Sequence, residues 1–198
     1  MKNLNNRYFA LRHGQSKPNI SQIILSHPEE GKKDEYTLTS EGENQVRNSL
    51  KKAKEQELLD SDTVIYSSPF SRCKKTAQIA KEVLGVKDKI IIDDRLQERW
   101  FGDWEKSHNS NYQKVWEKDR QNPKHQEEKV ESAFDVLKRT ISLIEDLEKK
   151  YTGKKIILVS HGDALQILQA GLLNKSPSVH REIESIDTAE IKELKIDK

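Results

Sequence analysis

Short apolar runs, rich in β-branched and aromatic residues, alternate along this chain with longer segments of helical periodicity. The runs are too short for helices and have the residue types that strands favour. Strands that alternate with helices predict an α/β fold, and we expect a three-layer α/β/α sandwich around a mostly parallel central sheet. The expected strands cover residues 8–11, 63–66, 90–92 and 156–160, with a further candidate at 189–196.

Capping signals mark where the intervening helices begin and end. A Ser or Thr followed three residues later by an acid satisfies free backbone N–H groups at a helix start. Proline suits the first turn of a helix, and glycine suits its end. Ser40 with Glu43 predicts the start of one helix, and Ser68 with Pro69 predicts the start of a second, which stops at Gly85. Ser132 with Asp135 predicts the start of a third, which runs to Gly153. A nearly all-apolar stretch predicts a mostly buried helix over 164–173.

Length and composition favour one domain over residues 1–198, because 33% hydrophobic content can supply one core. Lys and Arg total 35 against 33 Asp and Glu, spread along the chain, so we expect no nucleic-acid partner. No window has the length of a membrane span, and residues 1–6 lack the apolar core of a signal peptide. We therefore expect a cytoplasmic protein with no membrane partner. The pattern leaves monomer and homodimer equally open.

The single cysteine and four of the histidines carry little functional signal. Cys73 is the only cysteine, which excludes an internal disulfide and a Cys-based structural zinc site and fits a reducing compartment. Its neighbours place it on a helix face, where we expect it to pack. The histidines at positions 27, 108, 125 and 180 have no motif context, so we expect them on the surface.

The tripeptide Arg12-His13-Gly14 directly follows the first expected strand. Open α/β sheets bind ligands at the ends of such strands, and Gly14 lets backbone approach a ligand closely. A histidine there can attack phosphorus through one ring nitrogen if a backbone acceptor holds the other. His13 is therefore the candidate nucleophile.

Further residues supply the charge that phosphoryl transfer needs. Arg12 is adjacent, and Arg72 lies early in an expected helix, so two guanidinium groups can clamp one phosphate. His161 and Gly162 follow the strand at 156–160 as His13 and Gly14 follow the first strand. We expect the two histidines to meet at one sheet edge, with a protonated His161 stabilising charge on the phosphoryl oxygens.

Two other interpretations of these histidines stay open. His161 can be a loop histidine with its hydrogen bonds satisfied, or His161, Asp163 and His13 can together bind a metal ion. A metal site would leave the arginines unexplained.

The polar segment 106–123 interrupts the alternation of strands and helices. Tyr112, Val115 and Trp116 share one face of a helix there. Two interpretations are equally open: an ordinary surface helix held down by these side chains, or an insertion that shapes the substrate pocket.

Six blocks of residues together resemble the histidine phosphatase superfamily, also known as the phosphoglycerate mutase-like family, from about residue 8 to residue 188. The blocks are Arg12 to Asn19 (Arg-His-Gly-Gln-Ser-Lys-Pro-Asn); Leu38-Thr39, Gly42 and Gln45; Ser67-Ser68-Pro69, Arg72 and Thr76-Ala77; Leu96, Glu98, Phe101-Gly102 and Trp104-Glu105; Glu131-Ser132 and Arg139; and Val159-Ser160-His161-Gly162. Two places depart from the family pattern: Lys106 stands where most relatives have Gly, and residues 20–37 do not align confidently.

The resemblance implies a role for each matched residue. His13 would be phosphorylated, and Glu98 would be the proton donor. Arg12, Arg72 and His161 would hold the phosphoryl group, with Asn19 and Gly162 helping to bind it. Burial can keep a carboxyl protonated, whereas nearby arginines favour its ionised form, so the sequence leaves the charge of Glu98 open.

The resemblance implies a metal-independent phosphomonoester hydrolase that acts on a small phosphorylated substrate, with no cofactor. Trp104-Glu105 looks like the phosphatase branch, and the chain lacks the insertion and tail expected of a mutase. A phosphoglycerate mutase is the alternative, because it shares the phosphohistidine step. A non-catalytic binding protein on the same fold is a third class, disfavoured because every catalytic residue is present.

Overall fold

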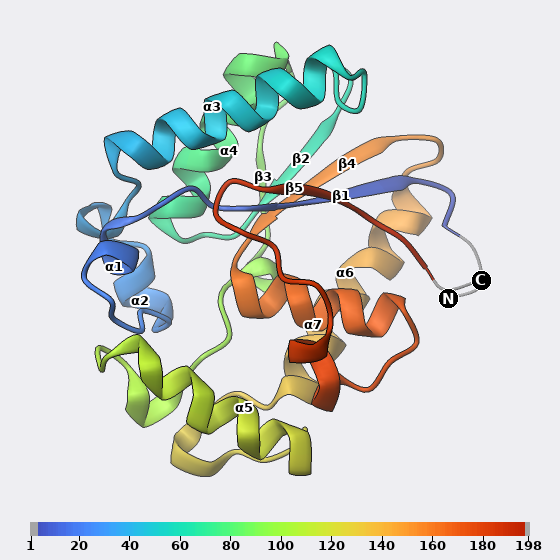
Figure 1. Cartoon of the computed structure of the whole chain (residues 1–198). Coiled ribbons are helices and arrows are strands. Elements are labelled where there is room, and N and C mark those ends of the chain that lie inside the picture. The colour runs from blue at the N-terminus through green and yellow to red at the C-terminus, as the bar shows by residue number, and fades with distance from the viewer. Residues whose placement is uncertain (1–3, 197–198) are drawn as a thin grey trace.

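Five strands form one sheet in the order β3-β2-β4-β1-β5 (Figure 1). The structure is a computed structural model that describes residues 4–196 of the chain. The three pairings among β1 to β4 are parallel, and β5 runs antiparallel to β1. The strands are β1 (Arg7–Arg12), β2 (Val64–Ser67), β3 (Ile91–Ile92), β4 (Lys155–Ser160) and β5 (Ile191–Leu194). The predicted mostly parallel sheet is confirmed, including the strand within 189–196. Residues 1–3 and 197–198 of the expected domain lie outside the described residues.

Helices cover both faces of the sheet, which confirms the three-layer prediction (Figure 1). Successive side chains of a strand point to opposite faces. Phe9 and Leu11 pack in the cluster that includes α3 and α4, whereas Tyr8 and Ala10 pack in the cluster that includes α6 and α7. The four covering helices are α3 (Ser40–Glu55), α4 (Ser71–Leu84), α6 (Ala133–Lys150) and α7 (Gly162–Leu172).

The N-caps of two helices differ from the predictions. Thr39, rather than Ser40, caps α3, because its hydroxyl accepts the N–H of Gly42 at 2.9 Å. Ser68 does not cap α4, which begins at Ser71. Its backbone N–H instead donates to Val159 of β4 at 2.9 Å, so the chain stays extended for longer than its helix signals suggest.

Ser132 caps α6 as predicted, by accepting the N–H of Asp135 at 3.0 Å. This helix ends at Lys150, before Gly153, and α7 starts at Gly162, earlier than 164. Such small differences are expected, because the apolar periodicity locates the body of a helix more precisely than its ends.

Shorter elements gather around the carboxyl ends of the parallel strands. Helix α5 (Tyr112–Gln121) lies within the interrupting segment, and its Val115 packs with Ile24 and Phe101 in a small separate core. No helix among residues 4–196 is long and apolar enough to cross a membrane. The remaining elements are α1 (Lys17–Ile20), α2 (Pro28–Gly31), η1 (Asp34–Tyr36), η2 (Asp94–Leu96), η3 (Gly102–Trp104), η4 (Asn109–Asn111), η5 (Glu127–Lys129) and η6 (Pro177–Glu182).

Lys106 has a φ of 61°, in the left-handed region that favours glycine. A glycine, which the family resemblance leads us to expect here, would adopt this conformation without strain. The lysine keeps the turn through its backbone N–H, which donates to Ile24 at 2.8 Å, and its ammonium group pairs with Glu30 at 2.9 Å.

Cys73 is fully buried on α4, as expected from its place in the sequence. Burial raises the pKa of its thiol to about 12, so the thiol stays protonated at neutral pH. It serves as packing, in keeping with the prediction.

Candidate active site

Adjacent parallel strands bring the two histidines together. Arg12 at the end of β1 is in register with Ser160 at the end of β4, so His13 and His161 leave the sheet side by side. Their ring centroids are 5.2 Å apart in an edge-to-face arrangement. Both side chains are buried. The expectation that the two histidines meet at one sheet edge is therefore confirmed.

His13 is held in one tautomer. Its Nδ1 lies 2.8 Å from the carbonyl oxygen of Gly14, and since a carbonyl only accepts, Nδ1 carries the proton. The Nε2 lone pair faces Arg72, whose Nε donates to it at 3.1 Å. Burial, followed by the charges of Arg72 and Arg12, lowers the pKa of His13 well below its usual value. The imidazole is therefore neutral, as a nucleophile must be.

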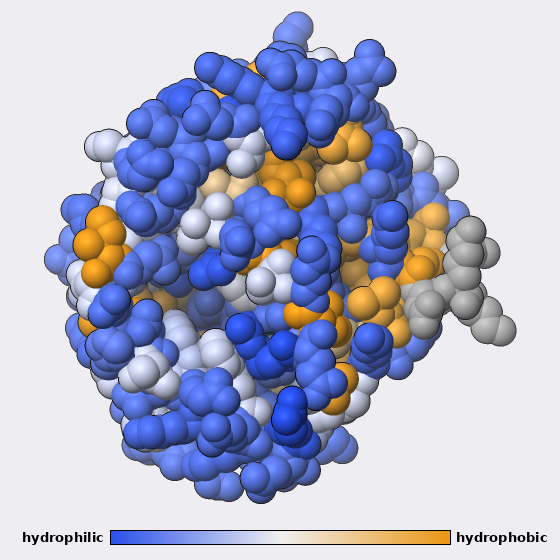
Figure 2. Space-filling view, viewed as in Figure 1, coloured by the Kyte–Doolittle hydropathy of each residue, from blue (hydrophilic) through white to orange (hydrophobic). Residues whose placement is uncertain are grey.

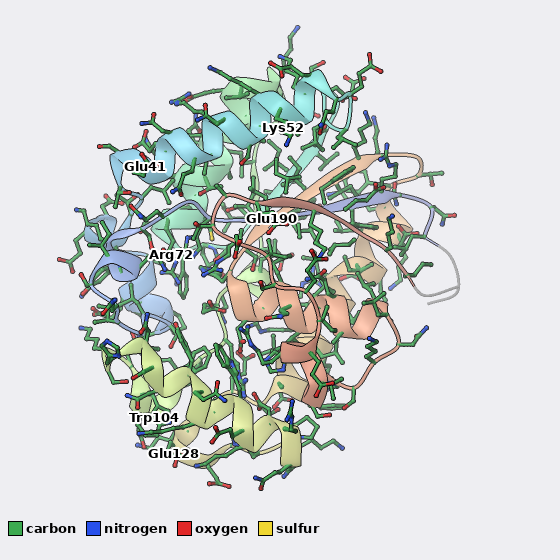
Figure 3. All side chains as sticks on the ribbon, in the orientation of Figure 1. Glu41, Lys52, Arg72, Trp104, Glu128 and Glu190 are labelled. Atoms are coloured by element: carbon green, nitrogen blue, oxygen red, sulfur yellow. The ribbon has the colours of Figure 1, made fainter. Side chains whose placement is uncertain are left out.

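Arg72 and Arg12 each keep donor atoms unused. Arg72 lies in the first turn of α4 and bonds the carbonyl of Leu25 through Nη2 at 3.0 Å (labelled in Figure 3). Arg12 bonds the carbonyl of Ile186 through Nη1 at 2.9 Å. Within the described residues, the buried Nη1 of Arg72 and Nε of Arg12 have no partner. Unsatisfied buried donors are costly, and an anion would satisfy both.

His161 lies behind His13, with its Nε2 2.9 Å from the hydroxyl of Ser68. Burial, then the charge of Arg72, lowers the pKa of His161 well below its usual value. Burial beside two arginines therefore favours the neutral ring in the empty site, whereas the expected protonated His161 refers to a bound phosphoryl group and stays a prediction. The positive charge facing the cavity comes from the arginines.

Glu98 is buried, and its Oε1 accepts the backbone N–H of Arg99 at 2.9 Å. Burial and then the charge of Asp163 raise the pKa of Glu98 to about 7, against the opposing effect of Arg72 and Arg12. The sequence left this competition open, and burial dominates. Glu98 can therefore hold a proton at neutral pH and release it.

A buried ionic network behind Glu98 has no signature in the sequence. Arg99 is fully buried and donates to both carboxylate oxygens of Asp119, at 2.5 and 2.8 Å. It also donates to Asp163 at 3.3 Å, and His125 lies 3.0 Å from Asp119. Burial opposes the ionisation of Asp163, but His180, Arg99 and Arg181 hold its pKa below the usual value. The network thus fixes a negative charge beside the pocket.

Two of the four histidines assigned to the surface are buried. His125 contacts Asp119, and His180 lies with Nε2 3.3 Å from Asp163. The surface prediction is wrong for both, because carboxylates distant in the sequence give each a buried partner. His108 is exposed, as expected, and His27 is partly buried.

The proposed metal ligands do not converge on one point. His13 is engaged by Gly14 and Arg72, and His161 by Ser68. Asp163 accepts hydrogen bonds from Arg99 and from Trp116. Among residues 4–196, no group of three or more His, Cys, Asp or Glu side chains is placed to hold a metal ion. The geometry therefore favours the phosphate-binding interpretation.

A cavity of about 250 Å³ opens at this edge of the sheet. Of the predicted site residues, His13, Arg12, Arg72, Glu98, Asn19 and Gly162 line it, and His161 lies just behind. A Cβ at position 162 would lie 3.2 Å from Cζ of Arg12, so glycine lets that guanidinium sit close. The side chain of Asn19 lines the cavity, but its Oδ1 accepts from Ser16, which leaves the amide N–H groups for a ligand.

The interrupting segment forms the outer wall of the cavity. Asn109, Tyr112 and Trp116 line it, while Tyr112 also packs against Phe101. The segment therefore both packs on the body of the protein and shapes the pocket. Arg181 of η6 completes the wall and was missed from the sequence, because it has no motif and lies far along the chain. The face in view around these elements is mostly hydrophilic (Figure 2).

Paired histidines and two arginines with free donors meet at the carboxyl edge of an α/β sheet, an arrangement suited to an anionic group. The chain belongs to the histidine phosphatase superfamily (branch 1), whose family model matches residues 8–198.

The chain is also similar to individual curated proteins and solved structures. The chain is 27% identical over 169 residues to the uncharacterized phosphatase PhoE of Bacillus subtilis, covering 85% of this chain and 78% of PhoE. It is 28% identical over 180 residues to the probable phosphoglycerate mutase GpmB of Photorhabdus laumondii, covering 88% and 78%. Among solved structures, a mycobacterial glucosyl-3-phosphoglycerate phosphatase superposes with a TM-score of 0.75 at 22% identity, covering 94% of this chain and 91% of the other.

Proposed function

We propose that this protein is a phosphomonoester hydrolase that works through a phosphohistidine on His13. The observation that carries the proposal is the state of His13: a buried, neutral imidazole whose protonated Nδ1 is held by Gly14 and whose Nε2 lone pair lies beside unused arginine donors. The phosphatase names of PhoE and of the mycobacterial structure support the same activity. A buried free thiol at Cys73 fits a reducing compartment such as the cytoplasm.

In the first step, the phosphate of the substrate accepts hydrogen bonds from the free N–H groups of Arg12 and Arg72. The Nε N–H of Arg72 then leaves His13 and donates to a phosphoryl oxygen. The Nε2 lone pair then attacks phosphorus, and the bond between phosphorus and the ester oxygen breaks. Protonated Glu98 donates its proton to the departing oxygen, which leaves as an alcohol.

In the second step, water attacks the phosphorus of phosphohistidine. The carboxylate of Glu98 takes a proton from that water, the phosphorus–nitrogen bond breaks, and inorganic phosphate leaves. His13 is again neutral, and Glu98 is again protonated. Arginine charge serves both steps, so the proposed reaction requires neither metal nor organic cofactor.

A phosphoglycerate mutase is the second candidate, supported by the similarity to GpmB. The two reactions share the first step and differ in whether water or a hydroxyl of a second substrate accepts the phosphoryl group. The hydrolase is proposed first because phosphatase names occur among both the sequence relatives and the structural neighbours.

The test is release of inorganic phosphate from a panel of small phosphomonoesters in EDTA, with conversion of 3-phosphoglycerate to 2-phosphoglycerate followed in parallel. Rapid release identifies the hydrolase, whereas isomerisation without release identifies the mutase. Intact-mass measurement at neutral pH should detect phosphate on the wild type and on His108→Ala, an exposed histidine, but not on His13→Ala. A phosphoenzyme in the His13→Ala variant would remove His13 from its role.

A further inference from the structure

Arg181 presents a third guanidinium to the cavity that already contains Arg12 and Arg72. It comes from η6, on the wall formed by α5 and away from the strand ends. Its Nη1 donates to Oε1 of Gln166 and lies 3.9 Å from Oδ1 of Asp163. Its Nε and Nη2 have no protein partner among residues 4–196, and the side chain is 36% exposed.

The Arg181 guanidinium is held in place before any ligand arrives. Its Cζ lies 3.8 Å from the centre of the Trp116 ring, a close stacking contact. Trp116 is fixed in turn by its indole N–H, which donates to Asp163 at 2.9 Å. Gln166 is fixed by its amide group, which donates to the carbonyl of Ile183 at 2.6 Å. A guanidinium braced in this way loses little conformational freedom when it binds an anion.

Asp163 neutralises Arg181 only in part. The nearest oxygen of Asp163 is 3.9 Å away, and this carboxylate also accepts from Arg99 and Trp116. Arg12 and Arg72 already match the two charges of a phosphate dianion. Arg181 is thus a further cation beside the phosphate site, only partly balanced by Asp163, with free donors on adjacent nitrogen atoms.

We propose that Arg181 binds a carboxylate on the leaving group, an inference that rests on the proposed function. The preferred substrates would then be small phosphomonoesters of hydroxy acids. The Nε and Nη2 edge of a guanidinium matches the two oxygens of a carboxylate. A cavity of about 250 Å³ suits a compact leaving group. The ionised Asp163 beside it disfavours a second phosphate dianion, which carries more charge than a carboxylate.

The experiment compares phosphoserine with phosphoethanolamine, which differ by the carboxylate alone. 3-Phosphoglycerate and glycerol 3-phosphate form a second pair. For the wild type, kcat/KM should be higher for the acid in each pair by roughly ten- to hundredfold, as expected for one charged hydrogen-bonded pair. Arg181→Gln should remove most of that preference, mainly through KM, and Arg181→Lys should keep part of it. Arg120→Gln, an exposed arginine on α5 that pairs with Glu182, should keep it in full.

Equal kcat/KM within each pair for the wild type would overturn the inference. So would an equal loss for both members in Arg181→Gln, which would assign the arginine only to bracing Trp116. If no phosphomonoester is hydrolysed, the proposed function fails separately. The inference is then decided by calorimetry in the His13→Ala background, where Arg181→Gln must weaken binding of phosphoserine at least tenfold more than binding of phosphoethanolamine.

Discussion

Nε of Arg72 lies 3.1 Å from Nε2 of His13, on the lone pair that the proposed reaction uses. The hydrogen bond orients the imidazole in the empty site, and it has to be given up before phosphorus is attacked. The same arginine is anchored at its other end by the carbonyl of Leu25. In the proposed reaction, Arg72 therefore positions the nucleophile and, when substrate arrives, becomes a ligand for its phosphate.

Replacing Arg72 with lysine should lower kcat/KM for every phosphomonoester by roughly a hundredfold or more, because an ammonium group cannot contact His13, Leu25 and phosphate at once. Steady-state kinetics checks this expectation. Arg47→Lys, an exposed arginine that pairs with Glu82, should behave as the wild type. Similar kinetics for the two variants would show that the planar group of Arg72 is dispensable.

Glu98→Gln should slow substrates with poor leaving groups far more than it slows p-nitrophenyl phosphate. Glutamine keeps the shape of the side chain and cannot donate the proton, which an alkoxide needs and a nitrophenolate does not. The loss for an alkyl phosphate should be roughly 10²- to 10⁴-fold. Glu117→Gln, on the exposed side of α5, is the matched control. Equal slowing of both substrates would remove Glu98 from the acid role.

Asp163→Asn should move the basic limb of the pH profile to lower pH. In the wild type, the pKa of Glu98 is raised to about 7, so kcat/KM for an alkyl phosphate should fall as the pH rises through about 7. Asp163 contributes to that rise, and removing its negative charge lowers the pKa of Glu98. Profiles of both proteins check this, with circular dichroism to confirm that the variant folds. An unmoved or upward-shifted limb would contradict the role given to Asp163.

Glu98 should make stability fall as the pH rises. The folded state holds its proton up to about pH 7, whereas an unperturbed glutamate has a pKa of 4.5, so unfolding releases a proton between these values. Glu98→Gln removes the effect. The variant should exceed the wild type in free energy of unfolding by on the order of 3 kcal/mol at pH 8 and match it near pH 4. Urea titrations at both values measure the difference, and a gap independent of pH would contradict the shifted pKa.

Much of the fold and the core of the site could be predicted from the sequence, because the signals are local. Apolar runs marked the strands, and the rule that parallel strands end at one edge brought His13 and His161 together. The resemblance added Glu98, which no local pattern separates from the many other acids of the chain.

Features that depend on tertiary packing were not predictable. Ser68 has the residue type of a helix cap, yet its hydroxyl lies 2.9 Å from His161. Arg99 and Asp119 form a buried pair across 20 positions, and nothing near either residue indicates burial. Arg181 reaches the pocket from η6, a segment without periodicity. In each case the partner that decides the role comes from a distant part of the sequence.

The separation between the two histidines is set by the spacing of neighbouring strands, since β1 and β4 pair in register up to Arg12 and Ser160. The opposite wall of the pocket comes from α5 and η6, which belong to no strand. In the proposed hydrolase, substitutions in that wall can change which alcohol is accepted without moving the groups that would act on phosphorus. An architecture of this kind lets one fold diverge toward new substrates through a few peripheral residues, while the reaction itself is inherited intact.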